Sequence, residues 1–532
     1  MGKAFCIPAA DKPGREFVNI PRLVLAGLSG GTGKTILSLG IARAWTRSGL
    51  RTAPFKKGPD YIDAAWLGLA AKVAATNLDP YLLDADKLRA LFCDRAADAD
   101  VAVIEGNRGL FDGKDLTGTC STAELARQLN APVILAMDCT KMTRTAAAVV
   151  AGCAVFEQGL NLAGVILNRT AGERHREVLR TTIEHYTGIP VLGMLPKLAD
   201  NPIRERHMGL VSDQEYEGHA YADREAALDA LADVVAAHVD LDRLHAIAAA
   251  APELIRPDVD LWPQPIPELA ARLAPANAAA PSDRPSEGAP AGNLAAPPES
   301  VAPPESAAAA HPDAPVIGYI RDAALWFYYR ENFEALERAG ARLVRLSLLD
   351  GAPWPEIHGL YLGGGFPETL AERLSDNIAT RERVRALAES GLPVYAECGG
   401  FMYLGRSVIH EGREFPMAGV FPVTTKLCER PQGLGYTEAR VVRENPFFEV
   451  GRTIRGHEFH YSRCVPDVVA DPEGAALEFV LDMTRGSGML HGRDGVVRAN
   501  VYAAYNHIFA LGEPGWAERF VAAALRRRSG GT

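Results

Sequence analysis

The sequence lacks a hydrophobic run long enough to cross a membrane. Its longest stretch of small apolar residues, 145–156, falls well short of the roughly 20 residues that a membrane helix needs. Residues 1–21 are charged and have no apolar core, so they do not look like a signal peptide. We therefore expect a soluble, cytoplasmic protein with no membrane partner.

The sequence also lacks paired cysteines and an excess of basic residues. None of its eight cysteines forms a C-x-x-C pair, which favours a reduced protein over a disulfide framework. The net charge of −10 argues against a nucleic-acid partner, although it leaves room for a local basic pocket.

One stretch is poor in aromatic residues and rich in alanine and proline, and it divides the chain. From about Trp262 to Ala314, the segment Ala-Pro-Pro-Glu-Ser occurs twice. Such a composition cannot bury enough apolar surface to offset the entropy of ordering, so we expect a flexible linker. The predicted division is an N-terminal extension at 1–21, a first domain at 22–262, a linker at 263–314 and a second domain at 315–532.

Both predicted domains alternate apolar strands with helical stretches. In the first, runs such as 102–106 and 132–138 are apolar until they end in polar residues. In the second, 316–320 and 359–362 follow the same plan. This pattern predicts an α/β fold, in which helices cover both faces of a parallel sheet and ligands lie at the carboxyl ends of the strands.

A glycine-dense turn, Gly27-Leu28-Ser29-Gly30-Gly31-Thr32-Gly33-Lys34-Thr35, lies between an apolar strand and a helical stretch. Backbone N–H groups and a helix N-terminus in this context can wrap a polyphosphate. We predict that Lys34 reaches the outer phosphates and that the Thr35 hydroxyl binds Mg²⁺. Leu28 stands where the strict pattern has glycine, as in dethiobiotin synthetase and the partition ATPases, but Ser29 replaces the second lysine of the latter. The predicted ATP-binding residues are Gly30, Gly31, Thr32, Gly33, Lys34 and Thr35.

Two carboxylates are predicted near the ends of neighbouring strands. Asp60 follows one strand and Glu105 ends the next. Oxygen ligands beside a phosphate loop suit Mg²⁺, so Asp60 and Glu105 join Thr35 as predicted metal ligands. The residues predicted to hold an acidic substrate are Lys56, Lys57 and Arg206.

In the second domain, Cys398 stands at a predicted turn from strand to helix, and glycines follow it directly. This arrangement is typical of a nucleophile elbow, in which the turn exposes the sulfur and the helix N-terminus lowers the pKa of the thiol. The N–H of Gly399 can stabilise an oxyanion, and Gly364 and Gly365 are further predicted donors.

The cysteine needs a base, and we predict His507, because a Tyr-x-His segment after a long strand-rich stretch is typical of triad amidotransferases. His457 and His460 alternate in a pattern that favours a strand over a zinc site. The third member of the triad stays unassigned, since Phe509 stands where class I amidotransferases carry a glutamate. Glu458 is a candidate for that role.

Seven segments together resemble one family. They are 55–63, 77–79, 105–106, 205–210, 361–365, 396–400 and 456–462. In this order they resemble the cobyrinic acid a,c-diamide synthases of cobalamin biosynthesis. The resemblance spans about residues 22–215 and 315–512, and it implies a dethiobiotin-synthetase-like ATPase domain fused to a flavodoxin-like class I glutamine amidotransferase domain.

The resemblance implies a carbon–nitrogen ligase that uses ATP, Mg²⁺ and L-glutamine. ATP would phosphorylate the a and c acetate carboxylates of cobyrinic acid, and Cys398 with His507 would release ammonia from glutamine to form the amides. Hydrogenobyrinic acid and Ni-sirohydrochlorin are alternative substrates. A partition-type switch ATPase and a scaffold that uses free ammonia stay open as other classes. The oligomeric state also stays open, with a homodimer as one alternative.

Overall fold

The chain divides into two compact units, residues 1–261 and 262–532, and each has its own sheet and core. The computed structural model describes residues 16–198, 205–206, 209–210, 220–263, 312–466 and 477–530. Most of the predicted linker at 263–314 therefore lies outside the described residues, as do residues 1–15 of the predicted N-terminal extension.

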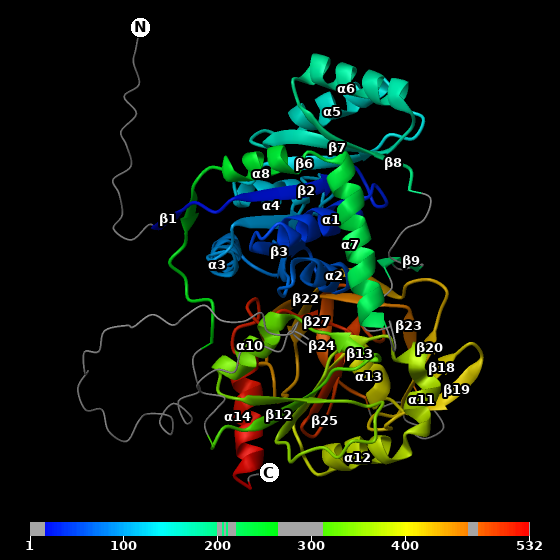
Figure 1. The fold of residues 1–532 in the computed structure, drawn as a ribbon. Helices are drawn as coiled ribbons and strands as arrows, with labels where there is room; N and C mark the ends of the chain where they lie inside the picture. The colour runs from blue at the N-terminus through cyan, green and yellow to red at the C-terminus, as the bar shows by residue number, and fades with distance from the viewer. Residues whose placement is uncertain are drawn as a thin grey trace. The chain divides into compact units, whose positions relative to one another are not determined.

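In the described part of the first unit, seven strands form a parallel sheet in the order β4-β3-β5-β2-β6-β7-β8 (Figure 1). Their apolar residues are buried on both faces, as is usual for parallel sheets. The strands are β2 Arg22–Gly27, β3 Thr52–Lys57, β4 Thr76–Leu78, β5 Val101–Glu105, β6 Val133–Asp138, β7 Leu162–Thr170 and β8 Val191–Pro196.

Helices cover both faces of this sheet, so the predicted α/β fold is confirmed. On one face α1 and α7 lie side by side (Figure 1), and Leu37 and Val235 pack in the same core as the strands. On the other face Phe92 packs against Phe55 of β3, with ring centroids 5.0 Å apart. The helices are α1 Lys34–Arg47, α2 Ile62–Ala71, α3 Ala85–Arg95, α4 Thr122–Gln128, α5 Thr145–Phe156, α6 Glu173–Thr187, α7 Ala220–His238 and α8 Leu241–Ala249.

Part of the predicted N-terminal extension belongs to the first unit. Glu16–Val18 forms β1, which pairs antiparallel with β11, Leu254–Arg256. Two further short strands, β9 at Glu205–Arg206 and β10 at Gly209–Leu210, pair with each other. Arg206, a predicted substrate contact, lies in β9, and its side chain is outside the described residues.

In the described part of the second unit, ten strands form a mixed sheet in the order β14-β12-β15-β17-β26-β25-β24-β21-β22-β27. Neighbours are parallel from β14 to β26 and antiparallel from β26 to β27. The strands are β12 Val316–Ile320, β14 Arg342–Leu346, β15 Gly359–Leu362, β17 Val394–Glu397, β21 Gly433–Val441, β22 Thr453–His460, β24 Glu478–Arg485, β25 Arg493–Arg498, β26 Val501–Ala504 and β27 His507–Ile508.

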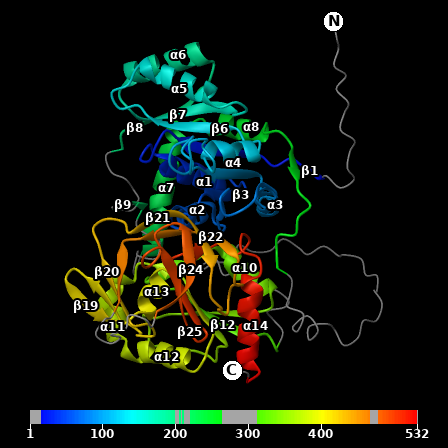
Figure 2. The ribbon, with the colours of Figure 1, turned by 180° about the vertical axis from the view of Figure 1, so that it is seen from behind.

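Helices cover both faces of the parallel part of this sheet as well. On one face α10 and α14 lie side by side in both views (Figures 1 and 2), and Trp516 and Phe520 pack against Tyr395. On the other face Phe401 and Val384 share a core with Val394. The helices are α10 Arg330–Arg338, α11 Ala371–Asp376, α12 Ile378–Glu389, α13 Gly399–Leu404 and α14 Trp516–Arg528, with a 3₁₀ turn, η2, at Pro367–Leu370.

Smaller strands complete the second unit. They are β13 Leu325–Phe327 and β16 Gly364–Gly365, which pair with each other, and β18 Ser407–His410, β19 Arg413–Pro416, β20 Val423–Leu427 and β23 Ser462–Pro466, which form a separate sheet. Among the described helices of both units, none combines the length and the apolar character needed to span a bilayer.

A buried arginine ties together three segments at the amino end of β2. The Arg22 side chain is fully buried and donates hydrogen bonds to the carbonyls of Ile20 at 2.8 Å, Leu129 at 2.7 Å and Pro252 at 2.6 Å. Burial lowers the pKa of Arg22 to about 10, so the guanidinium still carries its charge at neutral pH. Its partners are backbone carbonyl oxygens, and these acceptors would lose a hydrogen bond if the guanidinium were removed.

We expect Arg22→Met to lower the free energy of unfolding of the first unit by about 3 kcal/mol, because a buried acceptor left without its donor costs about 1–3 kcal/mol. Urea denaturation followed by tryptophan fluorescence of the full chain measures this change. Arg51→Met is the matched control: Arg51 pairs with Asp100 at the surface, and its loss should leave the transition in place. Equal midpoints for the two variants would contradict the role given to Arg22.

Candidate functional site

The glycine-dense turn of the first unit connects β2 to α1, as the sequence predicts. Gly33 precedes Lys34, the first residue of α1, with φ at 94°, a conformation that favours glycine. A Cβ at Gly33 would lie 2.3 Å from Nδ2 of Asn168, which donates to the Thr32 carbonyl at 3.1 Å. A Cβ at Gly30 would meet no other atom within 4 Å. The turn is thus anchored at Thr32 and open at Gly30, which suits a phosphate cradle.

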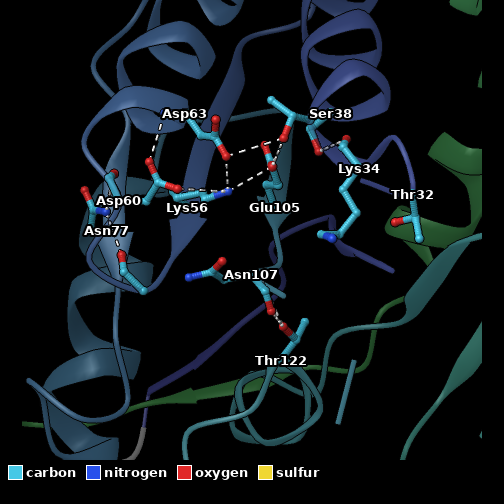
Figure 3. A network of polar contacts seen from close by, with 12 residues as sticks. Thr32, Lys34, Ser38, Lys56, Asp60, Asp63, Asn77, Glu105, Asn107 and Thr122 are labelled. Atoms are coloured by element: carbon cyan, nitrogen blue, oxygen red, sulfur yellow. Dashed lines mark hydrogen bonds and ion pairs between the residues drawn. The ribbon is translucent and has the colours of Figure 1, made fainter. Parts of the chain in front are cut away.

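Lys56 lies at the centre of a cluster of carboxylates beside this turn (Figure 3). Its Nζ atom is 2.6 Å from Asp63 Oδ2, 2.9 Å from Glu105 Oε1 and 3.6 Å from Asp60 Oδ2. The Thr35 hydroxyl donates to Glu105 Oε1 at 2.7 Å, and this bond joins α1 to the cluster. The predicted metal ligands Thr35, Asp60 and Glu105 therefore lie together, at the carboxyl ends of β3 and β5.

The cluster carries more negative than positive charge. Burial alone would lower the pKa of Lys56, but the charges of Asp63 and Glu105 hold this pKa well above its usual value. Burial and the charge of Asp63 raise the pKa of Asp60 to about 7, and burial raises the pKa of Glu105. One ammonium thus offsets three carboxyl groups only in part.

Glu105 has an oxygen available for a further ligand. Within the part of the chain that the structure describes, its buried Oε2 atom has no hydrogen-bond partner. The same described residues contain no ready-made group of three metal-ligating side chains. The Lys56 ammonium lies between the carboxylates of Asp63 and Glu105. A Mg²⁺ ion that keeps waters and phosphate oxygens needs only one or two protein ligands, and Glu105 and Thr35 fit that role.

The two predicted substrate lysines lie on opposite faces of β3. The sequence predicts Lys56 as a substrate contact. In the structure its side chain is 2% exposed and is engaged by the carboxylate cluster, so it is not available to a substrate. Lys57, the next residue along the strand, is 5% exposed and points to the other face, where burial lowers its pKa and the charge of Asp79 raises it.

Sequence reasoning missed Asp63 and the role of Asn77. Asp63 lies in the first turn of α2, three residues after Asp60, and its backbone N–H donates to Asp60 Oδ1 at 3.0 Å. The Asn77 amide donates to the carbonyls of Gly58 at 2.7 Å and Asp60 at 3.0 Å, which fixes the loop that carries both aspartates. The i, i+3 spacing of the aspartates at a helix start was the available signal.

In the second unit, Cys398 forms the predicted turn between β17 and α13. Its φ of 45° and ψ of −101° lie outside the usual regions, as in a strained nucleophile elbow. The Gly399 N–H bonds to the sulfur, and the thiol donates to the Phe459 carbonyl, with Sγ 3.8 Å from the oxygen. The predicted exposure is wrong, since Cys398 is 4% exposed. The predicted fall in the pKa of the thiol is also wrong, because burial and then the charge of Glu368 raise it.

The predicted base and oxyanion donors lie close together beside Cys398. A Cβ at Gly364 would be 2.5 Å from Cε1 of His507, and a Cβ at Gly399 would be 2.9 Å from the Gly365 nitrogen. Only glycine permits both approaches. Gly364, Gly365, Gly399 and His507 therefore converge on the end of β17, where the thiol lies.

Glu397, not Glu458, is the carboxylate next to His507. The His507 Nδ1 atom is 3.3 Å from Glu397 Oε2, and both side chains are 1% exposed. The Glu458 carboxylate instead accepts from the backbone of Ser487 at 2.6 Å and Gly488 at 2.9 Å, so the candidate role of Glu458 is wrong. Because a carboxylate only accepts, this contact fits a proton on Nδ1 of His507.

His457 and His460 lie in β22, so the predicted strand is confirmed. The His457 ring stacks on that of His507 with centroids 4.8 Å apart. The His460 ring stacks on Tyr505 at 3.6 Å. Both histidines thus support the Tyr505-x-His507 segment, and no metal cluster involves them within the described ranges.

Two family models match the chain, one in each unit. A CobQ/CobB/MinD/ParA nucleotide binding domain matches residues 23–210, and a CobB/CobQ-like glutamine amidotransferase domain matches residues 316–515. Curated relatives match nearly the whole chain. A cobyrinate a,c-diamide synthase of Magnetococcus marinus is 39% identical over 96% of this chain and 98% of its own length. The enzymes of the same name from Listeria monocytogenes and Salmonella typhimurium are 36% and 35% identical over 92% and 94% of this chain and 96% and 98% of their own lengths.

Proposed function

The chain belongs to the cobyrinate a,c-diamide synthase family, and we propose that it amidates the a and c acetate carboxylates of cobyrinic acid with ATP and glutamine. Family membership makes it a glutamine-dependent ligase of cobalamin synthesis. The observation that carries the finer proposal is the presence of two complementary sites on one chain. One is the phosphate turn with its carboxylates, and the other is Cys398 with His507 and its glycines.

The first site would make a carboxyl group reactive. A carboxylate is a poor electrophile at neutral pH, so the γ-phosphoryl group of ATP is transferred to it, giving an acyl phosphate and ADP. Lys34 begins α1, its ammonium donates to the Ser29 carbonyl of the turn at 2.7 Å, and it would neutralise charge on the phosphates. Thr35 and Glu105 would hold Mg²⁺, which supplies further charge neutralisation when bound.

Lys56 takes a different role from the one predicted. Its ammonium donates hydrogen bonds to the carboxylates of both Asp63 and Glu105. Lys56 thus acts as a buried cation that positions these two carboxylates. Lys57 and Arg206 remain the proposed contacts for the carboxylates of the tetrapyrrole.

The second site would supply the nitrogen. His507 Nε2 takes the thiol proton as the Cys398 sulfur attacks the side-chain amide carbon of glutamine. The N–H groups of Gly364, Gly365 and Gly399 would stabilise the oxyanion that forms on the amide oxygen. His507 then returns the proton to the leaving nitrogen, which departs as ammonia, and water cleaves the glutamyl thioester to glutamate. Ammonia displaces phosphate from the acyl phosphate and forms the amide.

We expect Cys398→Ser to abolish glutamine-dependent amidation and to leave ammonia-dependent amidation within about twofold of the wild type, because only the nitrogen supply uses the sulfur. Mass spectrometry of the tetrapyrrole product, with glutamine or ammonium chloride as donor, measures both rates. Unchanged glutamine use would remove Cys398 from the mechanism.

We expect Glu105→Gln to lower amidation with either donor by about 100-fold or more, because the loss of a carboxylate at a phosphoryl-transfer site removes charge compensation there. The same product assay measures the effect. Asp100→Asn is the matched control, since Asp100 lies just before β5 at the surface and pairs with Arg51. A similar loss in both variants would point to a defect in the strand and not in the site.

The substrate is tested by offering cobyrinic acid, hydrogenobyrinic acid and Ni-sirohydrochlorin separately with ATP, Mg²⁺ and glutamine. We expect a mass change of two amidations on cobyrinic acid. Faster amidation of either alternative would move the assignment to that tetrapyrrole and keep the chemistry. No nucleotide hydrolysis with any of the three would overturn the proposal.

A further inference from the structure

We propose that Glu397 is the positioning residue that completes a Cys398–His507–Glu397 triad, with the acid supplied by the residue directly before the nucleophile. This inference rests on the proposed glutaminase activity and adds a third residue to it. It explains how the site works with Phe509 at the position where a triad glutamate would follow the histidine.

The alternation of side chains along β17 places Glu397 and Cys398 on opposite faces of the sheet. Val394, Ala396 and Cys398 belong to one core, whereas Tyr395, two residues before Glu397, belongs to the other. Glu397 therefore points away from the thiol, toward His507 of β27, whose Nδ1 atom lies 3.3 Å from its carboxylate. β17 and β26 pair in parallel with Glu397 opposite Ala504, three residues before His507.

Hydrogen-bond donors around Glu397 hold its carboxylate in place and stabilise its negative charge. Oε1 accepts from the Ile508 backbone N–H at 3.2 Å and from the Tyr395 hydroxyl at 3.2 Å. Oε2 accepts from the Tyr361 hydroxyl at 3.4 Å and faces His507 Nδ1 at 3.3 Å. A buried carboxylate with several donors can hold an imidazole in one tautomer and stabilise the imidazolium that forms during catalysis.

Other titratable groups around His507 do not supply that negative charge. His457 of β22 stacks on it, and burial and then the charge of His507 hold the pKa of His457 well below its usual value, so this ring is neutral. Burial raises the pKa values of Tyr361, Tyr395 and the Cys398 thiol, which are neutral as well. Glu458 is held by Ser487 and Gly488.

Glu397→Gln in the full chain tests the assignment. We expect the kcat for glutamate release to fall about 100-fold or more, as in other triads without their acid, while the KM for glutamine changes by less than about threefold. The acid limb of the kcat/KM profile should move to lower pH, because the protonated ring of His507 loses the negative charge that compensates it. A purely structural defect would lower the rate without moving this limb.

Two controls separate the possible outcomes. Glu458→Gln removes an equally buried carboxylate and should keep kcat within about fivefold and the acid limb in place. Ammonia-dependent amidation should match the wild type in both variants. If Glu397→Gln keeps the wild-type kcat and pH profile, or if Glu458→Gln shows the loss instead, the assignment is overturned. If the wild type releases no glutamate at all, the proposed function has failed and not this inference alone.

A loss of ammonia-dependent activity in Glu397→Gln would show that this variant fails to fold. A second variant then tests the assignment. Tyr395→Phe removes one hydroxyl that donates to Glu397 and leaves the ring in its core. The carboxylate then interacts more strongly with His507, so the acid limb should move to higher pH, opposite to Glu397→Gln. An unmoved limb in Tyr395→Phe would overturn the assignment in that case.

Discussion

The carboxyl edge of a parallel sheet is the constraint on which both sites depend. Parallel strands all end at the same edge, and the helices that follow them present free backbone N–H groups there. In the first unit, the turn after β2 and Glu105 at the end of β5 meet because β2 and β5 are neighbours. In the second unit, Glu397 at the end of β17 and His507 after β26 meet for the same reason. Each site needs only one pair of adjacent strands to bring its main groups together.

This edge is buried enough that every charge placed there needs compensation. Lys56 is 2% exposed and is surrounded by carboxylates, and Glu397 is 1% exposed and is surrounded by donors. A buried charge without partners costs several kcal/mol, so the residues that surround Lys56 and Glu397 are needed for each site to form. Arg22 shows a different solution, in which backbone carbonyls take the place of a carboxylate. The buried charges are therefore held by opposite charges at Lys56, by hydroxyl and backbone donors at Glu397, and by backbone carbonyls at Arg22.

Local patterns predicted much of the fold and the residues nearest the chemistry. The strand before Gly27, the helix after Gly33 and the elbow at Cys398 each follow from a few consecutive residues, and the structure has them where expected. Interactions between distant residues could not be predicted in this way. Glu397 and His507 are 110 positions apart, and only the pairing of β17 with β26 makes them neighbours. Lys56 looked like a free cation because the sequence does not reveal that Asp63 and Glu105 surround it.

The wrong predictions for Cys398 have the same origin. A strand-to-helix turn does place a side chain at the edge of a sheet, but its exposure depends on what packs over that edge. Here the Phe459 carbonyl of β22 and the short strand β16, Gly364–Gly365, lie against it. The thiol is enclosed by elements that follow from the whole topology of the unit, so its burial and raised pKa could not be inferred from the residues on either side.

The adjacency of Glu397 and Cys398 has a consequence for how such a site can change. A single peptide bond links the nucleophile to the acid, and the pleat of β17 sends them to opposite sides, so any slip of that strand by one position would exchange their places. We therefore expect the active site to be intolerant of insertions or deletions within β17, which also supplies the Tyr395 hydroxyl that donates to Glu397. Transplanting it into another flavodoxin-like protein would require two neighbouring strand ends, the glycine strand β16 and the Phe459 carbonyl of β22, so a design would have to copy several elements of this unit together.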